Sequence, residues 1–113
     1  MRLEARKYLA DIDAAAGRIA RFTQGKQFAQ YLNDEILRSA VERQFGIVGE
    51  ALSRLVKDSP EIAAANPDHA KIVGFRNILV HGYASVDDRL VWGVIENHLQ
   101  PLREAVATLL ARK

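Results

Sequence analysis

The chain has 113 residues, of which 49% are hydrophobic and 27% charged, and its formal net charge is +2 at pH 7. This length suits one domain with its own core, and the absence of cysteine excludes disulfides and thiolate metal sites. No apolar run approaches the roughly 20 residues that span a bilayer, and the mixed charges near the start are unlike a signal peptide. We therefore expect a single domain over residues 1–113 that is cytoplasmic and not bound to a membrane. The small net charge does not by itself indicate a nucleic-acid-binding protein.

The first third of the chain predicts one helix followed by a linker. Apolar residues recur at helical spacing between residues 3 and 19, so we expect a helix that ends before Gly25. Residues 24–32 are expected to form a linker in which Phe28 and Tyr31 pack against the helices.

A second, longer helix is expected next. Asn33 suits its N-cap, because a short polar side chain accepts hydrogen bonds from the free N–H groups of a first turn. One apolar stripe runs from residue 37 to residue 55 and continues through Gly46 and Gly49. We interpret both glycines as points of close helix packing.

Three capping signals organise the remainder. Ser59-Pro60-Glu61 predicts a short extra helical turn, with serine as the cap and proline at the first helical position. Residues 66–81 predict a third helix. Residues 85–88 resemble a capping box for a fourth helix, whose apolar stripe spans residues 91–109 and which Pro101 should kink. The predicted fold is all-α, an antiparallel four-helix up-down bundle with a short extra helical turn.

The most informative segment lies at the end of the third predicted helix, where Arg76 and Asn77 are followed by His81 and Tyr83. Arginine offers a permanently charged fork that matches phosphate oxygens, and histidine takes and gives protons near neutral pH. This pairing suits chemistry on a phosphate better than chemistry on a carbonyl, and it points toward RNA as the substrate.

For RNA cleavage, His81 would act as base for the 2′-hydroxyl or as acid for the leaving 5′-oxygen, and Arg76 would stabilise the charged phosphorane. Asn77 would orient His81 or bind a phosphate oxygen. Tyr83 would position the phosphate or be a hydroxyl open to modification. We expect no metal and no other cofactor, because the three histidines lack convincing ligand spacing.

One rigid helix would not bring these groups together. Asn77 and His81 share a face, but Arg76 lies roughly 140° from His81 around an ideal helix axis. Either Gly82 ends the helix and redirects Tyr83, or a second copy of the chain supplies half of the groups. We expect both, and therefore a homodimer that places two histidines near one phosphate.

Judged by spacing alone, an arginine and a histidine on one helix are more often surface or packing residues than catalytic ones. Trp92 and Tyr31 are likewise expected to be core or interface aromatics rather than platforms for base stacking. The arginines of the second helix are expected to pair with its acids on a solvated face, part of which could border an RNA groove.

The string RNILVHGY, residues 76–83, resembles the Arg-x4-His-x-Tyr motif of the HEPN superfamily, and specifically its HepT-like toxin branch. Residues 47–51 look like the Gly-Glu-Ala segment of that branch, and residues 74–106 follow its closing pattern, so the resemblance covers nearly the whole chain. Residues 69–71 depart from it, because an aromatic residue is expected there.

The resemblance implies a metal-independent endoribonuclease that is the toxin of a toxin–antitoxin pair. It implies a homodimer in which paired Arg76 and His81 residues line a cleft between the protomers. It also implies a partner, an MntA-like minimal nucleotidyltransferase antitoxin, that transfers AMP from ATP to Tyr83. The added bulk and negative charge would compete with RNA for Arg76.

Two other functions are compatible with the sequence. The chain is alternatively a non-enzymatic HEPN binding module that partners a nucleotidyltransferase and presents nucleotide or substrate to it, which the modest net charge favours. A helical homodimer with a purely structural role is a weaker alternative, because a scaffold has no need of the polar motif.

Overall fold

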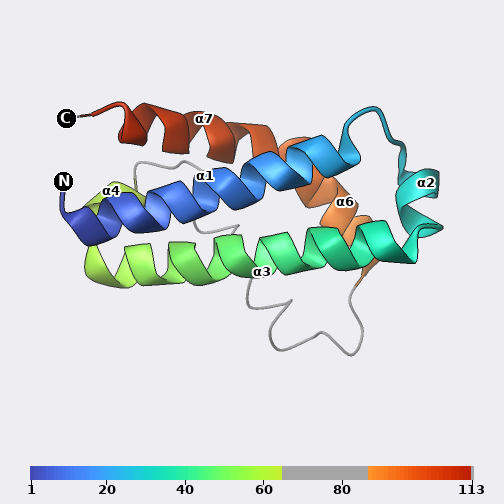
Figure 1. Cartoon of the computed structure of the whole chain (residues 1–113), viewed down its shortest axis with the longest axis horizontal. Helices are drawn as coiled ribbons and strands as arrows, with labels where there is room; N and C mark the ends of the chain where they lie inside the picture. The colour runs from blue at the N-terminus through green and yellow to red at the C-terminus, as the bar shows by residue number, and fades with distance from the viewer. Residues whose placement is uncertain (65–86, 113) are drawn as a thin grey trace.

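The computed structural model describes residues 1–64 and 87–112, and within these ranges every secondary-structure element is a helix. Three helices lie lengthwise beside one another, α6 runs obliquely, and two short helices lie at opposite ends of the molecule (Figure 1). In chain order the elements are α1 (Leu3–Thr23), α2 (Phe28–Leu32), α3 (Glu35–Asp58), α4 (Pro60–Ala63), α6 (Asp88–Asn97) and α7 (Leu99–Leu110). The all-α class is confirmed. The third predicted helix lies outside the described residues, so the four-helix arrangement and the homodimer stay predictions.

A continuous apolar core joins α1, α3, α6 and α7. Burying an aliphatic side chain contributes about 1.5–3 kcal/mol, so the helices are held mainly by the stripes that they turn inward. The central side chains of these four helices, each at most 2% exposed, include Leu9, Ile12, Ala16, Ile19, Val41, Phe45, Val48, Leu52, Leu55, Val91, Leu102 and Val106. The helical periodicity of the sequence predicted these stripes.

The end of α1 follows the sequence prediction. The Thr23 hydroxyl donates to the Ile19 carbonyl oxygen at 2.8 Å, and the chain leaves the helix through Gly25, which has a φ of 73°. That left-handed backbone conformation costs glycine little, since it has no Cβ to clash.

The prediction of a linker over residues 24–32 was wrong for its second half, which forms α2. Gln27 and Gln30 cap this helix reciprocally, and the Gln27 backbone N–H donates to Gln30 Oε1 at 2.7 Å. A capping box satisfies two free backbone N–H groups and so stabilises even a short helix. Tyr31 is fully buried and Phe28 packs against the core, as expected.

The N-cap of α3 is Asp34 rather than Asn33. The Asp34 carboxylate accepts from the Leu37 backbone N–H at 3.0 Å. Asn33 instead ends α2, where its side-chain amide donates to the Ala29 carbonyl at 2.8 Å. The shift arises because the preceding segment is itself helical and uses Asn33 to satisfy its own last turn.

Helix α3 continues through both of its glycines, as predicted, but the two differ in surroundings. Gly49 is buried in the helix interface. A Cβ added at Gly46 would meet no atom within 4 Å, so Gly46 is not a point of close packing and that interpretation was wrong for it.

Two capping signals after α3 are refined by the structure. Helix α4 begins at Pro60 as predicted, although the Ser59 side chain makes no capping hydrogen bond. Helix α6 is capped by Asp87, whose carboxylate accepts from the backbone N–H groups of Arg89 and Leu90 at 2.9 and 3.4 Å. The expected capping box over residues 85–88 is therefore corrected to a single aspartate cap.

The kink expected at Pro101 is a break at His98 that separates α6 from α7. Proline has no N–H to donate to the carbonyl four residues earlier, which is that of Asn97, and its ring crowds that carbonyl. Helical hydrogen bonds continue on both sides, from His98 N to Val94 O at 2.9 Å and from Leu102 N to His98 O at 3.2 Å.

Candidate functional site

The four residues of the predicted motif, Arg76, Asn77, His81 and Tyr83, lie outside the described residues. Their proposed catalytic, orienting and modification roles therefore stay predictions. What the structure describes is the chain that leads into this segment and out of it, together with the surfaces on the surrounding helices.

The described chain on the two sides of the motif segment lies at opposite ends of α3. Helix α4 follows directly on the C-terminal end of α3 and ends at Ala63, with Ala64 as its C-cap. On the other side, Asp88 in the first turn of α6 lies 3.8 Å from Arg38 near the N-terminal end of α3.

A polar cluster surrounds the start of α6. Arg38 on α3 pairs with Asp88 through its Nε atom at 3.8 Å, and its guanidinium also donates to the Leu32 carbonyl at the end of α2. One side chain therefore ties three helices together. The charged groups are half-buried, so solvent screens this pair less than a fully exposed one.

The electrostatics of this cluster are perturbed by burial. Burial raises the pKa of the Glu42 carboxyl, and the neighbouring Asp88 raises it further, while Arg38 opposes both. Burial likewise raises the pKa of the Tyr31 phenol, with Glu42 and Asp88 adding to it. The Tyr31 hydroxyl is buried and makes no hydrogen bond within the described part of the chain.

Sequence reasoning missed this cluster. It assigned the aspartates before α6 to capping and the charges of α3 to a solvated face, because the grouping exists only once α2, α3 and α6 meet. Perturbed titratable groups often mark functional sites. Here the contacts favour a structural role, because the Arg38–Asp88 pair fixes where α6 begins. Asp88 lies five residues after Tyr83 in the sequence.

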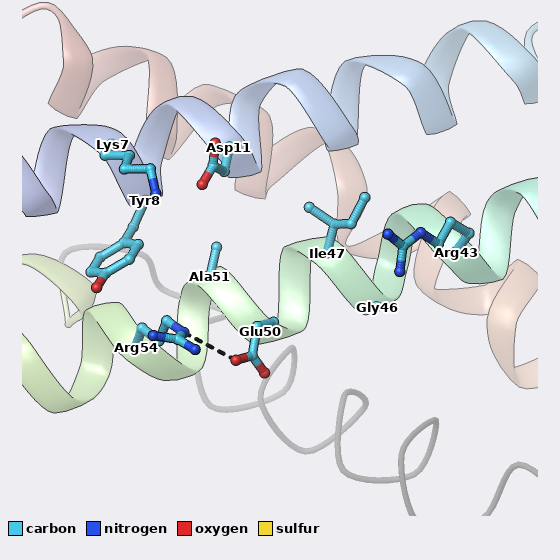
Figure 2. A pocket seen from close by; sticks show the side chains of 9 residues that line it. All are labelled: Lys7, Tyr8, Asp11, Arg43, Gly46, Ile47, Glu50, Ala51 and Arg54. Carbon is cyan, nitrogen blue, oxygen red and sulfur yellow. Dashed lines mark hydrogen bonds and ion pairs between the residues drawn. The ribbon is translucent and has the colours of Figure 1, made fainter.

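A pocket of about 470 Å³ opens between α1 and α3, and we call it the α1/α3 pocket. Figure 2 shows Lys7, Tyr8 and Asp11 reaching it from α1, opposite the side chains of α3. Arg54 donates to Glu50 at 3.0 Å, which confirms an ion pair on the solvated face of α3. Glu50 belongs to the Gly-Glu-Ala segment singled out in the sequence, and it lies at this pocket.

The described residues hold no group of three or more histidine, aspartate and glutamate side chains that could bind a metal ion. The expectation of metal-independent chemistry remains a prediction, because it concerns the motif segment. No described helix is long and apolar enough to cross a membrane.

Comparison with known proteins places residues 12–109 within a family model described as Ribonuclease HepT-like. A Methanocaldococcus jannaschii protein named "Putative RNase MJ1380" is 29% identical over 103 residues, which cover 91% of this chain and 94% of the relative. A Caldanaerobacter subterraneus protein named "Putative RNase TTE0752" is 29% identical over 108 residues, covering 96% of each. "Probable ribonuclease HepT" of Thermococcus cleftensis is 29% identical over 103 residues, covering 91% and 93%. No solved structure matches.

Proposed function

Because the chain belongs to the HepT-like ribonuclease family, we propose that it is an endoribonuclease whose catalytic residues are Arg76 and His81. The observation that carries the proposal is the family match over residues 12–109, a range that includes the whole RNILVHGY string. The relatives named as ribonucleases, which match over nearly their full length, support it.

The proposed reaction uses the RNA's own 2′-hydroxyl as nucleophile. A histidine takes the proton from this hydroxyl, the 2′-oxygen bonds to phosphorus, and the bond to the 5′-oxygen breaks as that oxygen receives a proton. Arg76 balances the negative charge that develops on the phosphorane oxygens. Asn77 and Tyr83 orient His81 and the phosphate. The products are a 2′,3′-cyclic phosphate and a free 5′-hydroxyl, with no metal ion required.

A homodimer gives this scheme its second proton-transfer group. One histidine in a single copy cannot act as base and acid on opposite sides of one phosphate at the same moment. Two copies of His81 facing a shared cleft would divide these roles, which suits the poor convergence of Arg76 and His81 on one ideal helix.

We further propose that the protein is a toxin held inactive by a minimal nucleotidyltransferase that transfers AMP to Tyr83. The new bond joins the tyrosine oxygen to the α-phosphorus of ATP, pyrophosphate leaves, and the phenolic proton goes to solvent or a base on the transferase. The modified tyrosine would carry a phosphodiester next to Arg76 and would exclude the RNA phosphate by charge and bulk.

Cleavage of a labelled RNA by the purified chain in excess EDTA tests the activity. His81→Ala and Arg76→Ala should each lower the rate by about 10²-fold or more, the scale of one lost acid–base or charge-stabilising group. Circular dichroism and melting temperatures identify variants that have unfolded. A folded His81→Ala protein that cleaves at the wild-type rate would overturn the assignment.

Intact mass tests the proposed modification separately. Incubation with the cognate nucleotidyltransferase and ATP should add one or more AMP units to the wild-type chain and none to Tyr83→Phe. Equal modification of Tyr83→Phe would show that another residue accepts the AMP.

The second candidate function is a binding module that presents nucleotide or substrate to a nucleotidyltransferase. The net charge of +2 favours it, because a protein that grips RNA usually concentrates more positive charge. This candidate requires that the purified chain leave RNA intact and that its complex with the transferase survive His81→Ala.

A further inference from the structure

We propose that a second pocket, between α2 and α6, holds one nucleotide of the RNA strand away from the cleavage site. This inference rests on the proposed ribonuclease function and adds a substrate subsite to it. The pocket, called here the α2/α6 pocket, has a volume of about 370 Å³. That volume lies within the range of roughly 300–1,000 Å³ usual for small-ligand sites. Its principal lining residues are Lys26, Phe28, Arg89, Trp92, Gly93 and Glu96.

The stacking surface of this pocket is the guanidinium of Arg89. It lies over the Phe28 ring with its central carbon 4.4 Å from the ring centroid. No carboxylate pairs with Arg89 within the described chain, and its side chain is exposed. Nucleobases stack on arginine guanidinium planes as well as on aromatic rings. Because the ring already holds the guanidinium, little side-chain freedom remains to be lost on binding.

Two aromatic side chains support this surface from behind. The Trp92 ring centroid lies 6.4 Å from that of Phe28 and 5.3 Å from that of Tyr31. Trp92 is only 8% exposed, so it forms a wall of the pocket rather than a stacking platform. This agrees with its expected role as a packed aromatic, and it leaves Arg89 as the group that faces a ligand.

The polar groups match the other parts of a nucleotide. Lys26 and Arg89 bring positive charge for a backbone phosphate, and Glu96 offers an acceptor for a base amino group or a 2′-hydroxyl. A Cβ added at Gly93 would meet no atom within 4 Å, so the pocket is open at that point. A flat cationic surface, a phosphate-binding amine and an acceptor together favour a nucleotide over an apolar ligand or a simple anion.

The pocket is also close to the predicted catalytic segment along the chain. Arg89 follows Tyr83 by six positions in the sequence. Six residues of even fully extended chain reach only roughly 20 Å. A strand of RNA held at the proposed cleavage site could therefore extend to the α2/α6 pocket.

Trp92 is the single tryptophan of the chain, so tryptophan fluorescence reports on the surroundings of this one side chain. In the full-length His81→Ala protein, titration with a short single-stranded RNA should change Trp92 emission. Adenosine monophosphate should produce a similar change only at concentrations at least tenfold higher. RNA that binds by filter retention without altering Trp92 emission would overturn the proposal. AMP binding as tightly as RNA would overturn it too, because the pocket would then hold a free nucleotide.

Gly93→Leu and Gly46→Leu form a matched pair on the wild-type background. Both place the same side chain on a helical glycine whose Cβ direction is open, the first in the α2/α6 pocket and the second in the α1/α3 pocket. Gly93→Leu should raise KM for a long RNA about tenfold, the scale of one lost base contact, with kcat unchanged. Gly46→Leu should change neither constant. Equal effects of the two variants would contradict the inference.

Substrate length and salt separate a subsite from a merely structural contact. With a dinucleotide substrate, too short to reach beyond the cleaved bond, Gly93→Leu should cleave at the wild-type rate. Lys26→Gln should lower the dependence of RNA affinity on salt by about one phosphate contact, and Lys7→Gln should not. Gly93→Leu slowing dinucleotide cleavage as much as long-RNA cleavage would indicate a folding defect and refute the subsite.

The outcomes distinguish this inference from the proposed function. RNA cleavage that depends on His81 but is indifferent to Gly93→Leu and Lys26→Gln would refute the subsite and leave the ribonuclease proposal intact. A chain that cleaves no RNA would refute the ribonuclease proposal, and the Trp92 titration would still decide whether the α2/α6 pocket binds RNA.

Discussion

The α1/α3 pocket and the α2/α6 pocket differ in volume and in how their charged side chains are held. The α1/α3 pocket is larger, about 470 against 370 Å³. Of its three cationic side chains, Lys7, Arg43 and Arg54, the last is paired with Glu50. In the α2/α6 pocket one of the two cations, Arg89, lies on the aromatic ring of Phe28. If RNA binds in the α2/α6 pocket as proposed, an arginine held on an aromatic ring matters more for binding than the volume of the pocket.

The same contrast holds for the ion pairs on α3. Arg54 and Glu50 are one helical turn apart on α3, and their side chains are 60% and 52% exposed. Arg38 and Asp88 are 25% and 28% exposed and join α3 to α6. The Arg38–Asp88 pair is therefore the less exposed of the two pairs, and its loss should cost more stability.

The largest effect is expected at Tyr31, behind the α2/α6 pocket. Tyr31→Ala should lower the free energy of unfolding by about 3–5 kcal/mol, because it leaves a cavity in the core. Tyr31→Phe should change it little or raise it, since the hydroxyl is buried without a hydrogen bond within the described chain. Denaturant titration measures both. A Tyr31→Phe loss above about 2 kcal/mol would show that the hydroxyl has a partner after all.

The next largest loss of stability is expected on breaking the Arg38–Asp88 pair, compared with breaking the Arg54–Glu50 pair. Arg38→Ala should cost about 1–2 kcal/mol of unfolding free energy, because it removes a charge-assisted hydrogen bond to the Leu32 carbonyl as well as the contact with Asp88. Arg54→Ala, its control on the same helix, should cost clearly less, because solvent screens that exposed pair. Equal losses in chemical denaturation would remove the distinction between the two regions.

Gly93 and Gly46 are helical glycines whose Cβ direction is open, and alanine at either position should affect stability alike. Gly93→Ala and Gly46→Ala should each raise the free energy of unfolding by about 0.5–1 kcal/mol, because alanine favours the helix and meets no atom at either site. Melting temperatures in matched buffer measure the gain. A loss of stability at either position would show that the site is less open than its geometry indicates.

A smaller, pH-dependent effect is expected at Glu42. Its raised pKa means that the folded chain binds more protons than the unfolded chain between the ordinary value of 4.5 and the raised one. Stability should therefore fall as pH rises through this window. Glu42→Gln should remove that component, so its stability relative to wild type should increase with pH. Parallel pH profiles for the two proteins would contradict the direction of the shift.

The sequence predicted the long helices well because each has a continuous apolar stripe with helical spacing. It placed their ends less well. Asn33 and Asp34 are both good caps, and only the folding of residues 28–32 into α2 decides between them. The sequence predicted that Pro101 would disturb the helix. The helix breaks at His98 and not at the proline itself, because the missing hydrogen bond leaves a carbonyl of the preceding turn without its partner.

The candidate site also has one part that the sequence predicted and one part that only the structure shows. The motif residues, Arg76 and His81 foremost, were identified in the sequence because they lie within one short string, and the family match supports the ribonuclease assignment. The α2/α6 pocket left no such signal, because Phe28 and Arg89 are 61 positions apart, by subtraction of their numbers. Their contact depends on how α2 packs against α6, which no local pattern specifies.

The chemical ends of the RNA fragments test the central claim most directly. Mass spectrometry of a defined oligonucleotide, cut by the wild-type chain in EDTA, should find a 2′,3′-cyclic phosphate on the upstream fragment and a 5′-hydroxyl on the downstream one. His81→Ala should yield neither. A 3′-hydroxyl with a 5′-phosphate, or the same fragments from folded His81→Ala, would contradict metal-independent cleavage by the 2′-hydroxyl with His81 as the proton-transfer group.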